Sequence, residues 1–434
     1  MSDQPTPTVS RVCQDGALVE ALYDPAGPST RLAIRSVDGS IFEAEGYGDS
    51  DERLVAYSPR NNLLATGCVL LPSAVGDFGD KEDLVADIRG FLHRYVELSP
   101  AFEEIAPYYV LLTWVYDAFN ELPYLRFRGE FGTGKTRALI AVGSLCYKPF
   151  FASGASTVSP IFHVLDAFGG TLLLDEADFR FSDATAELTK ILNNGTVRGL
   201  PVLRTMTNRH RELNPTAFRV FGPKIVAMRE GFSDRALESR FFTERMGRRA
   251  MRADIPLHRP ESLSEEALHL RNRLLGWRFA ARASIAPDPA RALAGASPRL
   301  NQVALALLSL VDDAAVRDRI ATHLAAADEP CAREAESLDA RLVRVVHRAF
   351  LAAVSPQVSI AHVTEKFNNS LDSFYIPYTA KAVGAMVRRL GLSTTKSRGV
   401  YVLSQSERAK VAALALRMGI DVAPMNSVTT DTTA

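Results

Sequence analysis

One eight-residue segment constrains the fold of this chain more than any other: Gly129-Glu130-Phe131-Gly132-Thr133-Gly134-Lys135-Thr136. Its spacing, Gly-x4-Gly-Lys-Thr, is that of a phosphate-binding loop, in which backbone N–H groups surround the phosphates of a nucleotide. We expect Lys135 to reach the β- and γ-phosphate oxygens and the Thr136 hydroxyl to ligate Mg²⁺. Thr136 also opens a helix, whose N-terminus favours anions. The segment therefore predicts a site for ATP or GTP.

The residues on either side of the loop have the composition that such a site needs. Residues 123–128 are short and β-prone, and Pro and Gly bound them, while residues 137–142 favour a helix. A Gly-rich turn that binds nothing is the alternative. The strand before the loop and the helix after it count against that alternative.

Residues 169–176, Gly-Gly-Thr-Leu-Leu-Leu-Asp-Glu, supply the second half of a hydrolytic site. They predict a buried parallel strand that ends in two carboxylates. Phosphoryl transfer needs one group that holds the metal and another that acts on the attacking water, and we assign these roles to Asp175 and Glu176. The pair points to an ATPase, because small switch GTPases generally lack such a glutamate. A strand followed by an acidic turn is the alternative.

A third predicted strand, residues 223–228, precedes a short run that ends in Ser239-Arg240. An arginine at this helix end can face the γ-phosphate of a neighbouring subunit. Arg240 is therefore a candidate catalytic residue. A surface salt bridge is the alternative role for Arg240.

These segments together resemble the AAA+ superfamily of P-loop ATPases. Four features carry the resemblance: the phosphate loop, the Leu-Leu-Leu-Asp-Glu strand, the strand at 223–228 in the place of the family's sensor strand, and the Leu-x-Ser-Arg ending at 237–240. More narrowly, the chain resembles the helicase and replication-initiator ATPases of phages, plasmids and integrated mobile elements. The resemblance covers about residues 80–325. It implies an α/β fold of the P-loop NTPase type, in which a parallel sheet core carries a helical lid.

The resemblance also implies ATP and Mg²⁺ as cofactors. It implies an arginine finger that acts in trans, at Arg240, with Arg235 as the second catalytic candidate. A finger in trans requires a head-to-tail contact between copies, by default a hexameric ring. Two further nucleotide contacts follow from the resemblance. One is Arg229, at a sensor position where the family usually has Asn or Thr, and the other is Arg299, at the start of a lid helix.

The pattern along the chain predicts five regions. They are a small β-rich N-terminal domain (1–78), the ATPase core (79–255), the helical lid (256–330), a winged-helix-like domain (331–410), and a C-terminal helix with a disordered tail (411–434).

Two basic segments are candidate contacts for DNA. The first, residues 197–215, has β-prone flanks and a basic tip, and it lies where ring helicases of the resembling family carry a pore hairpin. The second, residues 358–403, resembles a winged helix: two helices, a basic turn and a strand. The candidates are Arg204, Arg209, His210 and Arg211 in the first segment, and Lys381, Arg388, Lys396 and Arg398 in the second. A solvated hairpin and a protein-docking winged helix are the alternatives.

Charge and cysteine content indicate which part of the chain meets a polyanion and in which compartment the protein works. Acidic and basic residues balance at 50 each over 434 residues, but acidic residues predominate in the first hundred, so a polyanion should meet the later part. The four cysteines lack the paired spacing of a zinc site or a disulfide framework. We find no signal peptide pattern and no long apolar run, which predicts a cytoplasmic protein without membrane contact.

The leading hypothesis is an ATP-hydrolysing motor on DNA, a helicase or replication initiator that works as an oligomeric ring. The alternative is an ATP-dependent switch or assembly factor that recruits a partner protein without translocating. Remodelling of protein substrates is weaker, because the core lacks an aromatic pore loop of the Tyr-Val-Gly kind.

Overall fold

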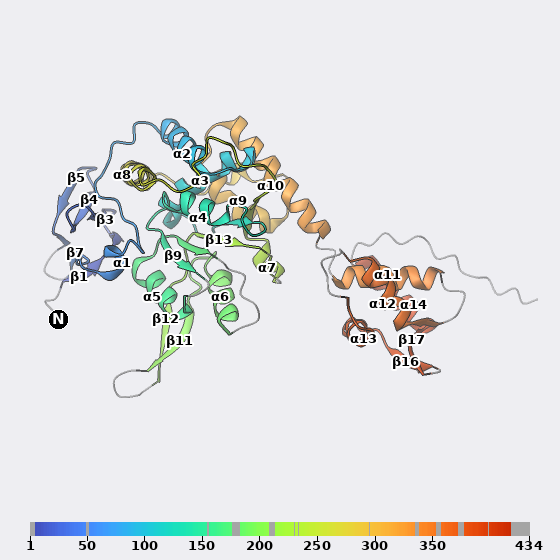
Figure 1. Cartoon of the computed structure of the whole chain (residues 1–434). Coiled ribbons are helices and arrows are strands. Elements are labelled where there is room, and N and C mark those ends of the chain that lie inside the picture. Colours follow the sequence, from blue (N-terminus) through green and yellow to red (C-terminus); the bar gives the residue numbers. More distant parts are fainter. Residues whose placement is uncertain are drawn as a thin grey trace, which may run out of the picture. The chain divides into compact units, whose positions relative to one another are not determined.

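The computed structural model describes residues 5–48, 52–153, 156–175, 183–207, 213–229, 231–232, 234–294, 296–334, 338–352, 357–371, 377–397 and 399–417. The chain divides into two compact units, Met1–Asp328 and Glu329–Ala434. Figure 1 shows the helices and strands of both units.

A five-stranded parallel sheet lies at the centre of the first unit, with the strand order β14-β8-β13-β10-β9. Its three middle strands are almost wholly buried and apolar, as expected for a sheet that helices cover on both faces. The predicted α/β class and parallel sheet are therefore confirmed. The strands are β8 (Tyr124–Arg128), β9 (Phe150–Ser153), β10 (Leu172–Asp175), β13 (Lys224–Met228) and β14 (Phe241–Arg245).

Helices pack around this sheet, and one of them, α3, is buried nearly all round. In α3 the Tyr109 hydroxyl donates to the Lys224 carbonyl at 2.8 Å, and the Trp114 indole donates to the Leu145 carbonyl at 2.9 Å. The aromatic side chains of α3, Tyr108, Tyr109 and Trp114, are therefore part of the core. The helices of the first unit are α2 (Lys81–Tyr95), α3 (Pro100–Trp114), η1 (Tyr116–Ala118), α4 (Lys135–Gly143), α5 (Val158–Phe168), α6 (Asp183–Asn194), α7 (Arg235–Glu238), α8 (Ser262–Ala281), η2 (Pro289–Arg291), α9 (Pro298–Leu308) and α10 (Ala314–Glu334), the last of which crosses the unit boundary.

Two small sheets precede the core. The first is antiparallel with the order β2-β3-β4-β5, and the second has the order β1-β7-β6. A separate hairpin, β11 (Val202–Thr207) and β12 (Leu213–Phe218), projects from the core below α5 and α6 in Figure 1. The N-terminal elements are β1 (Thr6–Thr8), β2 (Ser10–Val12), β3 (Leu18–Asp24), β4 (Ser29–Arg35), β5 (Ile41–Ala44), β6 (Gly46–Gly48), β7 (Arg53–Ala56) and α1 (Asn62–Ala65).

A buried cluster of charges joins the N-terminal strands to the core and to α8. The Arg278 guanidinium donates to Glu20 at 2.7 Å and to both carboxylate oxygens of Asp117 at 2.9 Å. Arg282 also donates to Asp117 at 2.9 Å, and the Tyr147 hydroxyl donates to Glu20 at 2.6 Å. The side chains of Arg278 and Glu20 are each 3% exposed. Four segments that lie far apart in sequence are thereby fixed to one another.

The second unit has its own apolar core, which includes Phe367, Val387 and Leu403. Ser359 and Thr379 cap its two middle helices by accepting hydrogen bonds from backbone N–H groups. Its sheet has the order β15-β17-β16. The elements are α11 (Leu338–Ala352), β15 (Gln357–Ser359), α12 (Ile360–Asn369), α13 (Ala380–Arg389), β16 (Thr394–Ser397), β17 (Val400–Ser404), η3 (Gln405–Glu407) and α14 (Arg408–Arg417).

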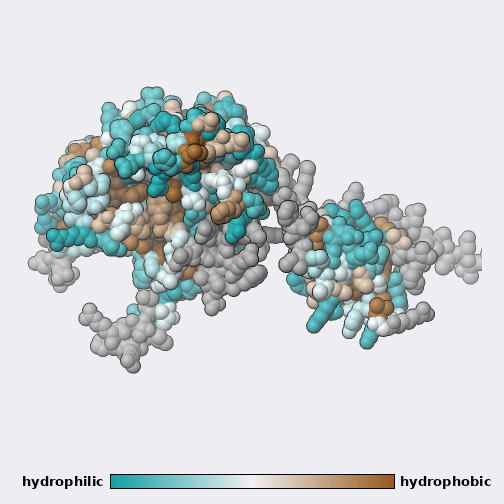
Figure 2. Space-filling model, in the orientation of Figure 1, coloured by the Kyte–Doolittle hydropathy of each residue, from teal (hydrophilic) through white to brown (hydrophobic). Residues whose placement is uncertain are grey.

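The surface visible in Figure 2 is mostly hydrophilic, and hydrophobic residues gather there in a few small areas. Among the described residues, none of the helices has the length and apolar character needed to cross a membrane. Cys13, Cys68 and Cys146 are free thiols, as the spacing predicted, and the side chain of Cys331 lies outside the described residues.

The charge cluster gives a first prediction, for Glu20→Ala. This change leaves Arg278 buried with only part of its countercharge, so we expect the free energy of unfolding to fall by about 3 to 5 kcal/mol. Urea denaturation measures it. Glu43→Ala is the matched control, because Glu43 pairs with Arg31 on the same sheet but is 40% exposed at the side chain; it should cost about 1 kcal/mol or less. Equal losses in the two variants would contradict the prediction.

The same cluster predicts an acid-dependent loss of stability. Burial by itself raises the pKa of Asp117, but the Arg278 and Arg282 guanidiniums outweigh burial and lower that pKa to about 2. A depressed pKa adds stability above the unfolded value near 3.9, and that stability disappears as the pH falls towards 2.

We therefore expect the gap in unfolding free energy between the native chain and Asp117→Asn to shrink by about 2 kcal/mol from pH 5 to pH 2. Urea titrations at both pH values measure the gap. A gap that stays constant would show that Asp117 is not held ionised by the two arginines.

Candidate functional site

The phosphate loop connects β8 to α4 at the carboxyl end of the parallel sheet. Gly132 and Gly134 have φ angles of 76° and 87°, in the left-handed region that favours glycine. A Cβ at Gly129 would lie 2.8 Å from the Met246 carbonyl oxygen, so this position also needs glycine for a close approach to the end of β14. The three glycines of the motif are therefore required by the backbone itself.

The Lys135 ammonium lies across this loop. It donates to the Glu130 carbonyl at 2.7 Å, and the Thr133 hydroxyl donates to the same oxygen at 2.8 Å. Lys135 is also the first residue of α4, so its charge lies beside the unpaired N–H groups of a helix N-terminus. Phe131 points into solvent, with 92% of its surface exposed. The loop thus gathers positive charge at one place.

Thr136, at the start of α4, and Asp175, at the end of β10, meet at this edge although β10 is not a neighbour of β8, the strand before the loop. The Thr136 hydroxyl donates to Asp175 Oδ2 at 2.9 Å. Strand β13 lies between β8 and β10, and all three run parallel, so their carboxyl ends share one edge. A hydroxyl and a carboxylate are hard oxygen ligands of the kind Mg²⁺ binds, so this donor pair fits the ion. Glu176 follows Asp175 directly but lies outside the described residues.

Arg229 lies at the same edge. It follows β13, is exposed, and its carbonyl accepts a hydrogen bond at 3.3 Å from Arg128, the last residue of β8. The structure therefore brings together the phosphate loop, Asp175 and Arg229, all of which were predicted to meet a nucleotide.

Arg240 lies at the opposite end of the sheet. It precedes β14, in which Phe241 stands beside Tyr124 at the start of β8. Its guanidinium donates to the Asn193 carbonyl and, at 3.0 Å, to the Asn193 side chain. Burial, together with the nearby Arg299 guanidinium, lowers the pKa of Arg240. Arg240 is thus separated from the phosphate loop of its own chain by the length of a strand.

Arg299 lies near Arg240 and not beside the phosphate loop. It donates to Gln302 at 2.9 Å, and Gln302 in turn bonds Glu121, which lies just before β8. The two arginines form one positive region at this end of the sheet. Arg235 begins α7, and its side chain lies outside the described residues.

One buried ion pair near the site escaped the sequence analysis. The Arg126 guanidinium in β8 bonds both carboxylate oxygens of Glu238 in α7, at 2.5 and 2.8 Å, and donates to Thr243 at 3.0 Å. It fixes the turn that carries Arg240 to the strand that carries the phosphate loop. The signal was available in the sequence, because an arginine inside an apolar parallel strand needs a buried partner.

An apolar cavity of about 220 Å³ adjoins the start of α4, and it too was not predicted. Its walls come from α2, from the first turns of α4, and from the segment that leads into α8. It is lined by Tyr95, Thr136, Arg137, Ile140, Pro256, His258, Arg259, Pro260 and Leu263. Thr136 belongs to both this cavity and the phosphate loop, so the two form one continuous site.

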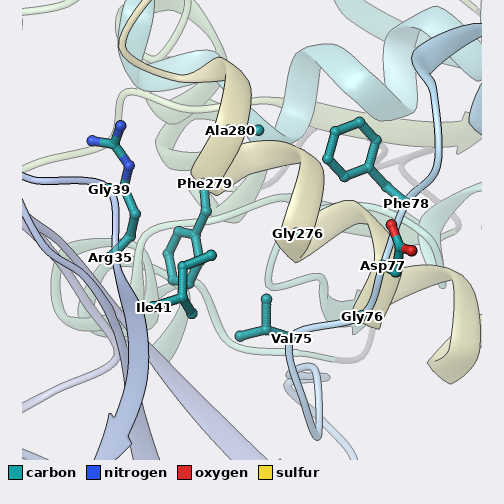
Figure 3. Close-up of a pocket in the computed structure, with 10 residues that line it drawn as sticks. All are labelled: Arg35, Gly39, Ile41, Val75, Gly76, Asp77, Phe78, Gly276, Phe279 and Ala280. Carbon is teal, nitrogen blue, oxygen red and sulfur yellow. The ribbon is translucent and has the colours of Figure 1, made fainter.

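A second cavity, of about 320 Å³, lies between the N-terminal strands and α8 (Figure 3). Phe279 and Ile41 lie close together in its middle, Phe78 lies on the far side, and Arg35 reaches upward from β4. Gly276 of α8 packs directly on the backbone of Gly76, where a Cβ would meet the Gly76 carbonyl at 2.1 Å. None of the residues that line this cavity was predicted to bind a nucleotide or DNA.

The hairpin β11–β12 lies between the Asp175 strand and the β13 strand in sequence. Arg204, in β11, lies over the Phe162 ring at 4.6 Å and donates to Glu187 at 3.3 Å. It is therefore partly engaged in holding the hairpin on α5 and α6. The predicted DNA contacts at the tip, Arg209, His210 and Arg211, lie outside the described residues.

In the second unit, Lys381, Arg388 and Lys396 are all exposed. Lys381 and Arg388 belong to α13, and Lys396 belongs to β16, where it stands opposite Tyr401. The Arg388 guanidinium lies 3.4 Å from the Thr394 hydroxyl, which connects α13 to β16. Arg398 lies outside the described residues.

Comparisons with known proteins find no matching family model and no matching curated protein. Among solved structures, the chain is similar to the C-terminal region of NrS-1, with 12% identity and a TM-score of 0.36 over 89% of this chain and 96% of that chain. It is also similar to the SCCmec type IV Cch active helicase, with 12% identity and a TM-score of 0.37 over 94% of this chain and 80% of that chain.

A third similarity is to JCV helicase, with 17% identity and a TM-score of 0.25 over 56% of this chain and 59% of that chain. All three TM-scores lie below 0.5.

Proposed function

We propose that this protein is an ATPase of the AAA+ type that drives work on DNA, as a helicase or replication initiator. One observation carries the proposal: the phosphate loop, the Lys135 ammonium and the Thr136–Asp175 pair converge at one edge of a parallel sheet. The Lys135 ammonium and the N-terminus of α4 suit the phosphates of a nucleoside triphosphate. The oxygens of Thr136 and Asp175 suit the metal ion that accompanies it.

Each residue has a part in hydrolysis. The backbone of residues 129–136 binds the β- and γ-phosphates, and Lys135 neutralises charge between them. Thr136 and Asp175 hold Mg²⁺, which supplies further neutralisation of the phosphate oxygens. Glu176 takes a proton from the attacking water. Arg229 lies at the edge where it can respond to the γ-phosphate.

The 220 Å³ cavity is suited to the nucleobase. It begins at Thr136, one residue beyond the lysine that binds phosphate, and its walls include the apolar groups of Ile140 and Leu263. Nucleotide sites commonly combine such an apolar pocket for the base with a polar loop for the phosphates.

Arg240 acts in the site of a neighbouring copy. Its place at the opposite end of the sheet excludes contact with its own phosphate loop, and a head-to-tail contact between copies brings the two ends together. Arg299, which lies near Arg240, adds positive charge to the same contact. Such a contact closes into a ring, by default of six subunits.

DNA binding rests on the two basic segments. The hairpin that follows the Asp175 strand grips the DNA backbone through Arg209, His210 and Arg211. The exposed Lys381, Arg388 and Lys396 in the second unit, with Arg398, provide further phosphate contacts. The helix, hairpin and strand order of that unit supports a winged helix.

Steady-state ATP hydrolysis tests this proposal. Four proteins are compared: the native chain, Lys135→Ala, Glu176→Gln and the double variant Arg209→Ala with Arg211→Ala. We expect Lys135→Ala to lose nucleotide binding and Glu176→Gln to bind ATP but hydrolyse it at least 100-fold more slowly, because a general base contributes about 10²- to 10⁴-fold. Single-stranded DNA should stimulate the native chain, and the double variant should lose that stimulation.

Two outcomes would overturn parts of the proposal. A native chain that binds no ATP would remove the ATPase assignment. Hydrolysis that depends on Glu176 but ignores DNA would remove the motor and favour a switch that recruits a partner protein.

The contact in trans predicts complementation between two inactive proteins. Lys135→Ala has an intact Arg240 and a defective site, whereas Arg240→Ala has an intact site and no finger. We expect their mixture to hydrolyse ATP faster than the sum of the two alone, because some interfaces combine both intact halves. The control mixes Arg240→Ala with the double variant Lys135→Ala and Arg240→Ala, which offers no finger. A rate equal to the sum in both mixtures would show that Arg240 does not act in trans.

A further inference from the structure

Arg137 directly follows Thr136, the proposed Mg²⁺ ligand, but its side chain bonds a segment more than a hundred residues further along the chain. Its guanidinium donates to the carbonyls of Pro256 and Leu257, at 2.5 and 2.6 Å. These two residues belong to the segment 256–260, which leads from the end of the core into α8. A residue of the phosphate-loop helix therefore holds the entry to the lid by two charge-assisted hydrogen bonds.

This segment has little else to fix it. Leu257 is 84% exposed, so apolar burial does not anchor it. Within the described residues, Arg137 is the sole side chain that bonds the carbonyls of Pro256 and Leu257. The flanking positions are fixed, because Ile255 is 2% exposed and the Pro260 carbonyl accepts from the Leu263 N–H at 3.3 Å. Arg137 thus holds the middle of a short strap whose ends are secured independently.

The strap is also one wall of the 220 Å³ cavity. Pro256, His258 and Pro260 line it from this side, and Ile140 and Tyr95 line it from the side of α4 and α2. Tyr95 is in turn fixed, because its hydroxyl donates to Glu266 at 2.7 Å. One wall is therefore rigid, and the other depends on Arg137.

We propose that Arg137 is a positioning residue for the nucleobase: it holds the strap 256–260 at the spacing that lets the base fit between it and Ile140. The inference rests on the proposed ATP site. Arg137 also lines the cavity, but its guanidinium is bonded to the strap, so its proposed role is to hold that wall and not to bind the phosphates or the attacking water. Its loss should weaken recognition of the base and leave recognition of the phosphates intact.

Binding of two ligands to the full chain separates these effects. Calorimetry in the presence of Mg²⁺ compares ATP with inorganic tripolyphosphate, which has the phosphates but no base. For Arg137→Met we expect the affinity for ATP to fall about tenfold. A tenfold change in affinity corresponds to about 1.4 kcal/mol, which is a modest part of the binding free energy of the base. The affinity for tripolyphosphate should stay within about twofold of the native value.

Arg137→Lys provides a graded variant. A lysine keeps the charge, but its single ammonium lacks the forked donors that reach two carbonyls at once. We expect an ATP affinity between those of the native chain and Arg137→Met. Preference for ATP over GTP should fall in the same order, because a loosened wall discriminates less between purines.

Arg273→Met is the matched control. Arg273 belongs to α8, donates to the Phe78 carbonyl at 3.1 Å and pairs with Asp87, but lies outside the cavity. It should leave both affinities unchanged. Equal losses of ATP and tripolyphosphate in Arg137→Met would overturn the inference and place Arg137 at the phosphates, and an unchanged ATP affinity would overturn it as well. If the native chain binds neither ligand, the ATP site itself is wrong.

Discussion

The arrangement of the first unit depends on how the buried Arg278 charge is compensated. Arg278 is almost wholly removed from water, and such a group is stable only where carboxylates surround it. Glu20 and Asp117 supply these carboxylates. Glu20 belongs to β3 of the N-terminal sheet, and Asp117 belongs to η1, the short helix that follows α3. The N-terminal strands, the core and α8 must therefore pack together, because separating any of them leaves an uncompensated charge. The N-terminal strands are for this reason part of the same compact unit as the parallel sheet.

The direction of the strands divides the core into two chemically different ends. The phosphate loop and Asp175 occupy the carboxyl end, and Arg240 and Arg299 occupy the other. Two internal contacts hold the Arg240 end in place: Arg126 of the phosphate-loop strand pairs with Glu238, and Asn193, near the end of α6, accepts hydrogen bonds from Arg240. The first unit therefore carries the glycine-rich loop with Lys135 at one end of its sheet and two arginines, Arg240 and Arg299, at the other.

How far the sequence predicted the site depended on how local each interaction is. The glycines were recognisable because the loop's own backbone geometry demands them, and Lys135 because it stands at a fixed spacing from them within eight residues. The Arg126–Glu238 pair spans 112 positions and the Arg137 contact spans 119, and in neither case does the spacing reveal the partner. Arg299 illustrates the same limit: its residue type and its position at a helix start suited a nucleotide contact, but the packing of α9 places it near Arg240.

The sequence by itself determined the phosphate loop, the apolar strand that ends at Asp175, and the alternation of strands and helices that makes a parallel sheet. These features depend on short-range rules of backbone geometry and on the burial of apolar strands. Only the tertiary structure decided which charges are buried, where the 220 Å³ cavity beside α4 lies, and at which end of the sheet each arginine stands. The physical reason is that burial and pairing are properties of segments brought together from distant parts of the chain, so no local pattern encodes them.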